Sequence, residues 1–156
     1  MMSLLLGLSL IFAVCRRLEA DSPVPPGVGL GLYSGVGPGG LGFYALSAKK
    51  GFGPRQAVEG AVGGYFREFY AHVDYKWYPG WSLFHHKNLP LYIGPGLSTF
   101  VGHDGTWVGL RGTIGTSRLF PREKPLELFV EFTPSFFVTP ERIWEAALGF
   151  GGRIYF

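Results

Sequence analysis

The sequence predicts an all-β fold, an eight-stranded antiparallel up-and-down β-barrel preceded by a leader segment. Three observations support this class. In residues 143–156 two sets of side chains, one small or apolar and one partly polar, alternate with the period of two that belongs to a strand. The 156 residues include 25 glycines and 17% aromatic residues, while only 16% are charged, against about 25% in soluble domains. No ten-residue segment has the helical period of about 3.6.

The leader, residues 1–20, is predicted to be a secretory signal peptide. Its apolar run, residues 4–14, is too short for a transmembrane helix but suits the core of such a peptide, and residues 18–20 form a candidate cleavage site. No basic residue precedes the run and two arginines follow it, which is unusual for a signal peptide. Lipid attachment at Cys15, a retained anchor and a different translation start are the alternatives.

Two regions follow the leader. Residues 21–26 are proline-rich and are expected to form an extended lead-in, and residues 27–156 form a single predicted barrel domain. Cys15 is the only cysteine, so the mature chain is predicted to have neither a disulfide nor a thiolate metal site. The formal net charge of +3 comes without a basic run or an RNA-binding motif, so nucleic-acid binding is not expected.

The first half of the barrel region contains four alternating segments. In residues 28–33, a valine and two leucines alternate with two glycines and a tyrosine. Residues 35–40 match the phosphate-binding pattern G-x-G-x-x-G, but the alternating segment 41–47 follows in place of the required helix, so a turn is expected. Glycines interrupt the apolar row of residues 56–66. Residues 69–78 have the clearest alternation, since all the apolar side chains stand opposite a polar or phenolic set.

The second half contains four more strands, at residues 89–101, 106–117, 126–138 and 143–156, each with an apolar row on one face. Pro95, inside the first of them, predicts a β-bulge because proline cannot donate to a ladder. The predicted connections between the eight strands are residues 35–40, 48–55, 67–68, 79–88, 102–105, 118–125 and 139–142.

The alternation also predicts which side of the wall meets lipid. A membrane-spanning strand needs about 9–11 residues with one apolar face, and such barrels carry aromatic residues at the membrane boundaries. The apolar rows are therefore expected to face hydrocarbon and the ionic rows to face the lumen. With eight strands, both chain ends lie on one side, and the interior is just wide enough for side chains to fill it.

The predicted lumen contains a network of charged side chains. A buried charge must be paired or hydrated, because desolvating it alone costs several kcal/mol. We expect a salt-bridged plug that fixes strand register; a water-filled conductive path and a catalytic site are the alternatives. Glu127 and Glu131 lie more than about 12 Å apart along one strand, too far for a shared acid–base dyad. The predicted network comprises Glu59, His72, Asp74, Lys76, Arg111, Glu127, Glu131, Glu145 and Arg153.

Aromatic residues gather near both ends of the predicted strands, as expected of girdles at two membrane interfaces. His85 and His86 are adjacent, but no third ligand has a suggestive spacing, so neither a metal site nor another cofactor is predicted. The outward rows contain neither histidine nor acid, which argues against a lipid-modifying enzyme. The predicted interfacial aromatics are Phe66, Phe69, Tyr75, Trp77, Tyr78, Trp81 and Trp144.

Three stretches together carry a family resemblance: residues 90–94 (PLYIG), 125–131 (PLELFVE) and 149–156 (GFGGRIYF). They resemble a family of small OmpA-like outer-membrane barrels of unassigned function, known from spirochaetes and other diderm bacteria, over roughly residues 27–156. The resemblance implies Sec-dependent delivery, insertion by the barrel-assembly machinery and a location in the outer membrane. It also implies a C-terminal aromatic insertion signal. The residues that fit this signal are Phe150, Ile154 and Phe156.

The connections depart from that family. The four predicted on the side opposite the chain ends are short, and the three longer, basic ones lie on the side of the chain ends. Outer-membrane barrels usually have the long loops outside and the short turns inside. Some relatives are reported to bind host proteins through surface loops, and the short turns here weaken such a role.

The sequence thus predicts an outer-membrane barrel with a closed lumen and a structural or interaction-platform role. The alternatives are a narrow pore for ions or small solutes and a secreted soluble barrel that binds a ligand. Expected partners are outer-membrane lipid, the assembly machinery during insertion, and an unidentified host or envelope protein. The chain is expected to be a monomer without enzymatic activity.

Overall fold

The computed structural model describes residues 23–37, 42–65, 68–85, 88–103, 105–121 and 123–156. The predicted signal peptide, residues 1–20, and the predicted interfacial Phe66 lie outside these ranges. Residues 23–26 of the predicted lead-in are described: they contain bends, and Val24 is buried.

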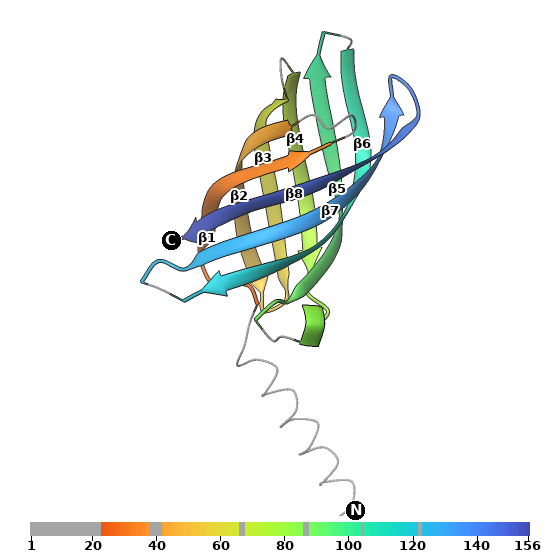
Figure 1. The fold of residues 1–156 in the computed structure, drawn as a ribbon. Coiled ribbons are helices and arrows are strands. Elements are labelled where there is room, and N and C mark those ends of the chain that lie inside the picture. The colour runs from red at the N-terminus through yellow and green to blue at the C-terminus, as the bar shows by residue number, and fades with distance from the viewer. Residues whose placement is uncertain (1–22, 38–41, 66–67, 86–87, 104, 122) are drawn as a thin grey trace, which may run out of the picture.

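Eight antiparallel strands close into one barrel in sequence order, and β1 pairs with both β2 and β8 (Figure 1). The predicted all-β, eight-stranded up-and-down barrel is therefore confirmed. Among the described residues the one helix is the short 3₁₀ helix η2, Leu83–His85, and none there is long and apolar enough to cross a membrane. The strands are β1 (Val28–Val36), β2 (Gly42–Gly53), β3 (Gln56–Tyr65), β4 (Glu68–Trp77), β5 (Leu91–Gly102), β6 (Gly105–Phe120), β7 (Leu126–Thr139) and β8 (Ile143–Tyr155).

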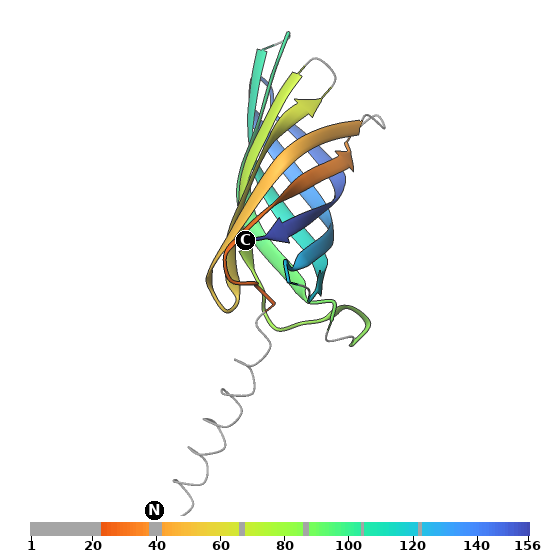
Figure 2. The same ribbon diagram turned by 90° about the vertical axis from the view of Figure 1, so that its left-hand side faces the viewer.

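The barrel has two different ends. The connections after β1, β3, β5 and β7 lie at one end, which we call the hairpin end. The beginning of β1 and the end of β8 lie at the other, the terminal end, where Val28 and Phe156 exchange two backbone hydrogen bonds of 3.2 and 3.1 Å. The β5–β6 hairpin extends furthest at the hairpin end (Figures 1 and 2). The longest connection, residues 78–90, lies at the terminal end as predicted, but the β2–β3 connection at that end is only residues 54–55, so the prediction of three longer connections there is wrong for one of them.

Two segments predicted as turns are partly strand. β2 continues to Gly53 and β6 to Phe120, so the predicted connections at residues 48–55 and 118–125 are too long. Basic residues do not end these strands because they follow the alternation across the wall: Lys49 is buried in the lumen while Lys50 is exposed. The expectation that Lys49 lies in a loop is therefore wrong.

Pro95 does not create the predicted bulge. The β4–β5 pairing is interrupted beside Pro95 and resumes in the same register, while the β5–β6 pairing runs through it, with Pro95 opposite Gly112. Pro134 interrupts the β6–β7 pairing in the same way. A proline removes a ladder donor on one side of its strand, which requires no extra residue. The register shifts of this barrel lie elsewhere, between Gly51 and Gly53 and between Val108 and Gly109.

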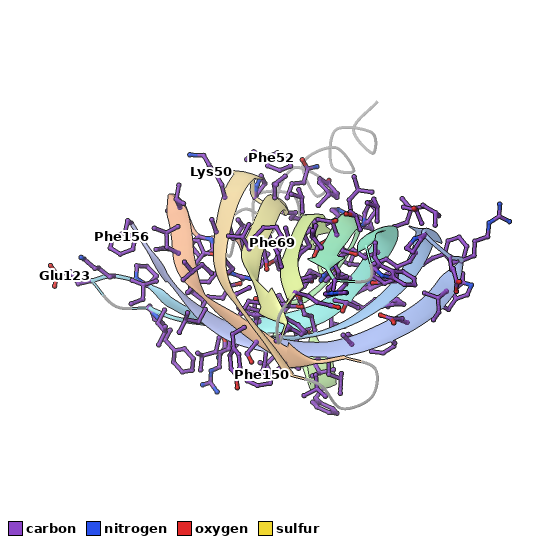
Figure 3. The ribbon with its side chains drawn as sticks, turned by 90° about the horizontal axis from the view of Figure 1, so that it is seen from above. Lys50, Phe52, Phe69, Glu123, Phe150 and Phe156 are labelled. Atoms are coloured by element: carbon purple, nitrogen blue, oxygen red, sulfur yellow. The ribbon has the colours of Figure 1, made fainter. Side chains whose placement is uncertain are left out.

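The wall separates an apolar exterior from an ionic lumen, which confirms the prediction that the apolar rows point outward and the ionic rows point into the lumen. Val73 is 57% exposed and Phe150 is 51% exposed, whereas Asp74 and Glu131 are at most 1% exposed. Viewed from above, Phe150 and Phe156 lie on the outer side of the wall (Figure 3). The alternation along each strand therefore assigns side chains to the correct face.

Aromatic rings share the lumen with the charges, and inward glycines leave room for them. A Cβ added to Gly115, for example, would lie 2.5 Å from the ring of Tyr92. A small cluster closes the terminal end: Val24, Ala57, Tyr78 and Tyr92. A larger one lies nearer the hairpin end: Tyr33, Phe43, Ala45, Ala61, Tyr70 and Phe129.

Candidate functional site in the barrel lumen

Eight charged side chains form a continuous series of alternating charge through the lumen, which we call the ion chain. Four are cationic and four anionic, none is more than 5% exposed, and every link joins opposite charges. Six of the eight strands supply them. Because an unpaired buried charge is strongly destabilising, complete pairing is what a narrow interior requires. The ion chain runs, in order, through Lys49, Glu127, Arg153, Glu59, Lys76, Glu131, Arg111 and Asp74.

The ion chain begins near the terminal end. Lys49 Nζ lies 2.6 Å from Glu127 Oε1, and Glu127 Oε2 lies 3.2 Å from Arg153 Nη1. Lys49 Nζ also donates a 2.6 Å hydrogen bond to the hydroxyl of Tyr78, and Tyr155 donates one of 2.8 Å to Glu127 Oε2. Two buried phenols thus complete the hydrogen bonding of the first charges.

Glu59 on β3 is the central link. Its two carboxylate oxygens contact Arg153 Nη2 and Lys76 Nζ, so one anion joins two cations from different strands. Lys76 Nζ then lies 2.7 Å from Glu131 Oε2, which also accepts a 3.0 Å hydrogen bond from Tyr92. The side chains of Glu59 and Lys76 have no exposed surface, so these links are shielded from water.

Arg111 on β6 carries the series toward the hairpin end. Its Nη2 lies 3.4 Å from Glu131 Oε1, and its Nε lies 3.0 Å from Asp74 Oδ1. Arg111 also donates to the hydroxyl of Tyr70, and Thr113 donates a 2.9 Å hydrogen bond to Asp74 Oδ2. The last anion of the ion chain is therefore held by a guanidinium and a hydroxyl.

His72 lies between two anions of the ion chain. Its Nε2 is 3.8 Å from both Glu59 Oε1 and Asp74 Oδ2, and its Nδ1 is 2.8 Å from the hydroxyl of Tyr70. With a neutral His72 the formal charges of the ion chain cancel, since there are four of each sign. The arrangement can therefore brace six strands electrostatically without adding net charge to the lumen.

The ion chain and the predicted network differ at three residues: Lys49, His72 and Glu145. Every predicted member except Glu145 lies in the ion chain or, in the case of His72, beside it. Glu145 is half-buried near the hairpin end, apart from this set. Lys49 is the member that the sequence interpretation missed, because the glycines and proline that follow it indicate a turn. The available signal was the spacing of two residues between Ser47 and Lys49, which places both side chains on the same face of β2.

Tyr78 is not an interfacial aromatic, and that prediction is wrong. It is fully buried one residue beyond β4 and holds Lys49. The inward alternation of β4 simply continues through Lys76 to Tyr78, which places the ring in the lumen although the residue stands at a strand end. Burial raises the pKa of the Tyr78 phenol above its ordinary value, so the hydroxyl stays protonated.

The other described members of the predicted aromatic set lie on the outer surface. Phe69 and Trp144 are exposed near the hairpin end, and Trp77 and Trp81 are exposed near the terminal end. Tyr75, on the outward row of β4, is half-buried. The three residues of the expected insertion signal are also exposed: Phe150, Ile154 and Phe156.

Beyond the ion chain, the lumen widens into a cavity of about 360 Å³ at the hairpin end, which we call the vestibule. Its inward positions include small side chains, among them Ser98, Ser135 and Ala147, which leave the space unfilled. Glu68 and Glu145 line it as well. Five aromatic side chains form much of its wall: Phe43, Tyr70, Phe100, Trp107 and Phe137.

Comparison of the chain with protein-family models and with curated proteins finds no match. The resemblance to small OmpA-like barrels therefore stays a prediction. Within the part of the chain that the structure describes, no three His, Cys, Asp or Glu side chains are placed to hold a metal ion. The functional interpretation depends on the wall, the ion chain and the vestibule.

Proposed function

We propose that this chain is an outer-membrane β-barrel whose lumen is closed by the ion chain, with a structural or interaction-platform role. The observation that carries the proposal is the polarity of the wall: all eight strands expose apolar side chains outward around an ionic interior. In water, exposed apolar area costs about 25 cal/mol per Å², and soluble monomers rarely expose apolar patches above a few hundred Å². A bilayer removes that cost.

The dimensions of the strands support the same proposal. They contain from 9 residues in β1 to 16 in β6, and about 9–11 tilted residues are enough to cross a bilayer core. Exposed aromatics at both ends, such as Trp144 and Trp81, are distributed as interfacial girdles would be. Under this proposal the leader directs export, and the assembly machinery recognises the C-terminal aromatic row.

The interaction-platform role is proposed for the terminal end. Exposed basic side chains occur at this end, on and between the strands, and Lys124 Nζ lies 4.7 Å from the ring centroid of Phe156. A partner with an acidic surface would complement them. Among the described residues of this end, the exposed basic ones are Lys50, Arg118 and Lys124.

A closed lumen is favoured over a narrow pore. Glu59, Lys76 and Arg153 have no exposed side-chain surface, so a permeating ion would have to break links of the ion chain. Planar-bilayer recordings of the purified protein distinguish the two functions. Silence is expected, and steady unitary currents would establish the pore instead. A secreted soluble barrel is disfavoured because it needs a polar exterior.

Refolding tests the membrane proposal directly. We expect the mature chain to fold only when detergent or lipid vesicles are present, and to migrate differently on gels before and after boiling. A monomer that forms the same barrel in buffer without any amphiphile would contradict the proposal.

A pair of outward substitutions adds a depth-dependent measurement. In vesicles, Val73→Arg near the middle of β4 should cost about 2–4 kcal/mol, and Val101→Arg near the hairpin end about 0–1 kcal/mol. Both valines are exposed, so a soluble barrel would tolerate the two arginines equally. Equal unfolding free energies for the two variants in urea would therefore argue against a bilayer around this wall.

A further inference from the structure

We propose that the vestibule is a binding site for a small organic cation, an ammonium group attached to an apolar or aromatic body. This inference goes beyond the proposed function and does not depend on it. It requires only the folded barrel and its hairpin end, whether lipid or water surrounds the wall. A volume of about 360 Å³ is suited to a small molecule rather than to a bare ion.

Two carboxylates determine the charge of the vestibule. Glu68 at the start of β4 and Glu145 on β8 line the same cavity and interact electrostatically with each other. Within the described ranges, neither forms an ion pair with a basic side chain. Two neighbouring carboxylates repel each other when both are ionised, and a cation between them relieves that repulsion. The vestibule therefore favours a positive ligand.

Arg111 does not reverse this preference. It is the one basic side chain among the described residues that line the vestibule, and its guanidinium is already engaged by Asp74, Glu131 and Tyr70. Its pairing leaves little positive charge for an incoming anion, whereas the charge of Glu68 and Glu145 is not compensated in this way.

The aromatic wall supplies the second element of the site. Consecutive rings pack side by side: Phe43 and Tyr70 have centroids 5.2 Å apart, Tyr70 and Phe100 4.7 Å, Phe100 and Phe137 5.5 Å, and Phe137 and Trp107 6.2 Å in an edge-on arrangement. These rings come from five different strands and form a continuous arc. Aromatic faces attract ammonium groups, most strongly where water is excluded, and they also pack against an apolar body.

Ser98 supplies an independent indication that a ligand belongs here. It lines the vestibule, is only 4% exposed, and its hydroxyl has no hydrogen-bond partner among the described residues. Most buried polar groups in native proteins are hydrogen-bonded, so such a hydroxyl requires an explanation. An ammonium N–H can donate to Ser98 Oγ, which would satisfy it.

The test uses one probe and two analogues of matched shape. The probe is 2-phenylethylammonium; 2-phenylethanol replaces the cation by a neutral group, and phenylacetate replaces it by an anion. Binding to the full mature barrel is measured by titration calorimetry in a maltoside detergent, because amine-oxide and choline head groups would compete for the site. We expect the ammonium to bind at least about tenfold more tightly than the alcohol, with no binding of phenylacetate.

Variants locate the binding. The double substitution Glu68→Gln and Glu145→Gln should weaken binding of the ammonium at least about tenfold and leave binding of the alcohol unchanged. Glu141→Gln is the matched control, since Glu141 is exposed at the same end but does not line the vestibule. Heat-modifiable gel mobility verifies that each variant is folded.

Three results would overturn the proposal: no binding of the ammonium to the native barrel, equal binding of ammonium and alcohol, or a folded double variant with native affinity. The first two need only the native chain, so a variant that fails to fold leaves the test decisive. A barrel that needs no amphiphile would refute the membrane proposal and leave this binding result unaffected.

Discussion

The terminal and hairpin halves of the lumen are built by the same eight strands, yet one is filled and the other is open. In the terminal half, large charged and phenolic side chains occupy the interior and every charge of the ion chain has an opposite neighbour. In the hairpin half, serines and an alanine leave a cavity, and two carboxylates lie at its edge without a basic partner in the described ranges.

Residue volume explains the difference. The strand number of a barrel largely sets its width, so the inward side chains decide how much of the interior is filled. On β7 the inward row changes from Glu127, Phe129 and Glu131 to Thr133 and Ser135 toward the hairpin end. One strand therefore contributes both to the plug and to the vestibule. The comparison suggests that the terminal half stabilises the barrel while the hairpin half is available for binding.

The largest expected effect comes from removing one carboxylate in each half. Glu59→Gln takes away the anion shared by Arg153 and Lys76 and leaves an uncompensated buried positive charge, at a cost of about 3–5 kcal/mol. Glu145→Gln removes no ion pair in the described structure and should change stability by no more than about 0.5 kcal/mol. Urea unfolding in detergent, followed by tryptophan fluorescence, measures both. Equal losses would show that the two halves are not energetically different.

Alternation along single strands was sufficient to predict the barrel and the side of the wall on which most residues lie. Asp74 and Val73 are adjacent, yet one is buried and the other exposed, because neighbouring residues of a strand point to opposite faces. Where the prediction failed, a local signal overrode this rule: the glycines after Lys49 indicated a turn, and the position of Tyr78 at a strand end indicated an interface.

The partners within the lumen could not be predicted in the same way. Lys49 and Glu127 are 78 positions apart in sequence, and their contact depends on the closure and shear of the whole barrel. The vestibule depends on the summed volumes of inward side chains from several strands, which no single segment reveals. Pro95 shows a related limit. Proline lacks a backbone N–H donor, and the sequence around it does not reveal whether the strand accommodates this loss with a β-bulge or with an interruption of the pairing, as occurs here.

A smaller effect is expected from two hydroxyls. Thr113→Val removes a hydrogen bond to the buried carboxylate of Asp74 while keeping the shape of the side chain, and should cost about 1.5–3 kcal/mol. Ser98→Ala removes a hydroxyl with no partner among the described residues, so the unfolding free energy should fall by less than about 0.5 kcal/mol or rise slightly. The same urea titrations apply. A large loss for Ser98→Ala would mean that its hydroxyl is already satisfied and is not held for a ligand.

The smallest expected difference in stability is between alanine substitutions at two inward glycines of β5, one in each half of the lumen. It depends on how much space lies beside each glycine. A Cβ on Gly94 would lie 1.6 Å from the backbone oxygen of Tyr75, which the strand cannot move without disturbing the wall. The three atoms nearest to a Cβ on Gly102 instead all belong to the side chain of Glu68, the closest at 2.6 Å. Gly94→Ala should therefore cost about 1–3 kcal/mol. Gly102→Ala should be close to neutral, because the Glu68 side chain can turn aside and alanine restricts the unfolded chain. Unfolding midpoints in urea measure the pair, and a Gly102→Ala variant as unstable as Gly94→Ala would show that the hairpin half is packed as rigidly as the terminal half.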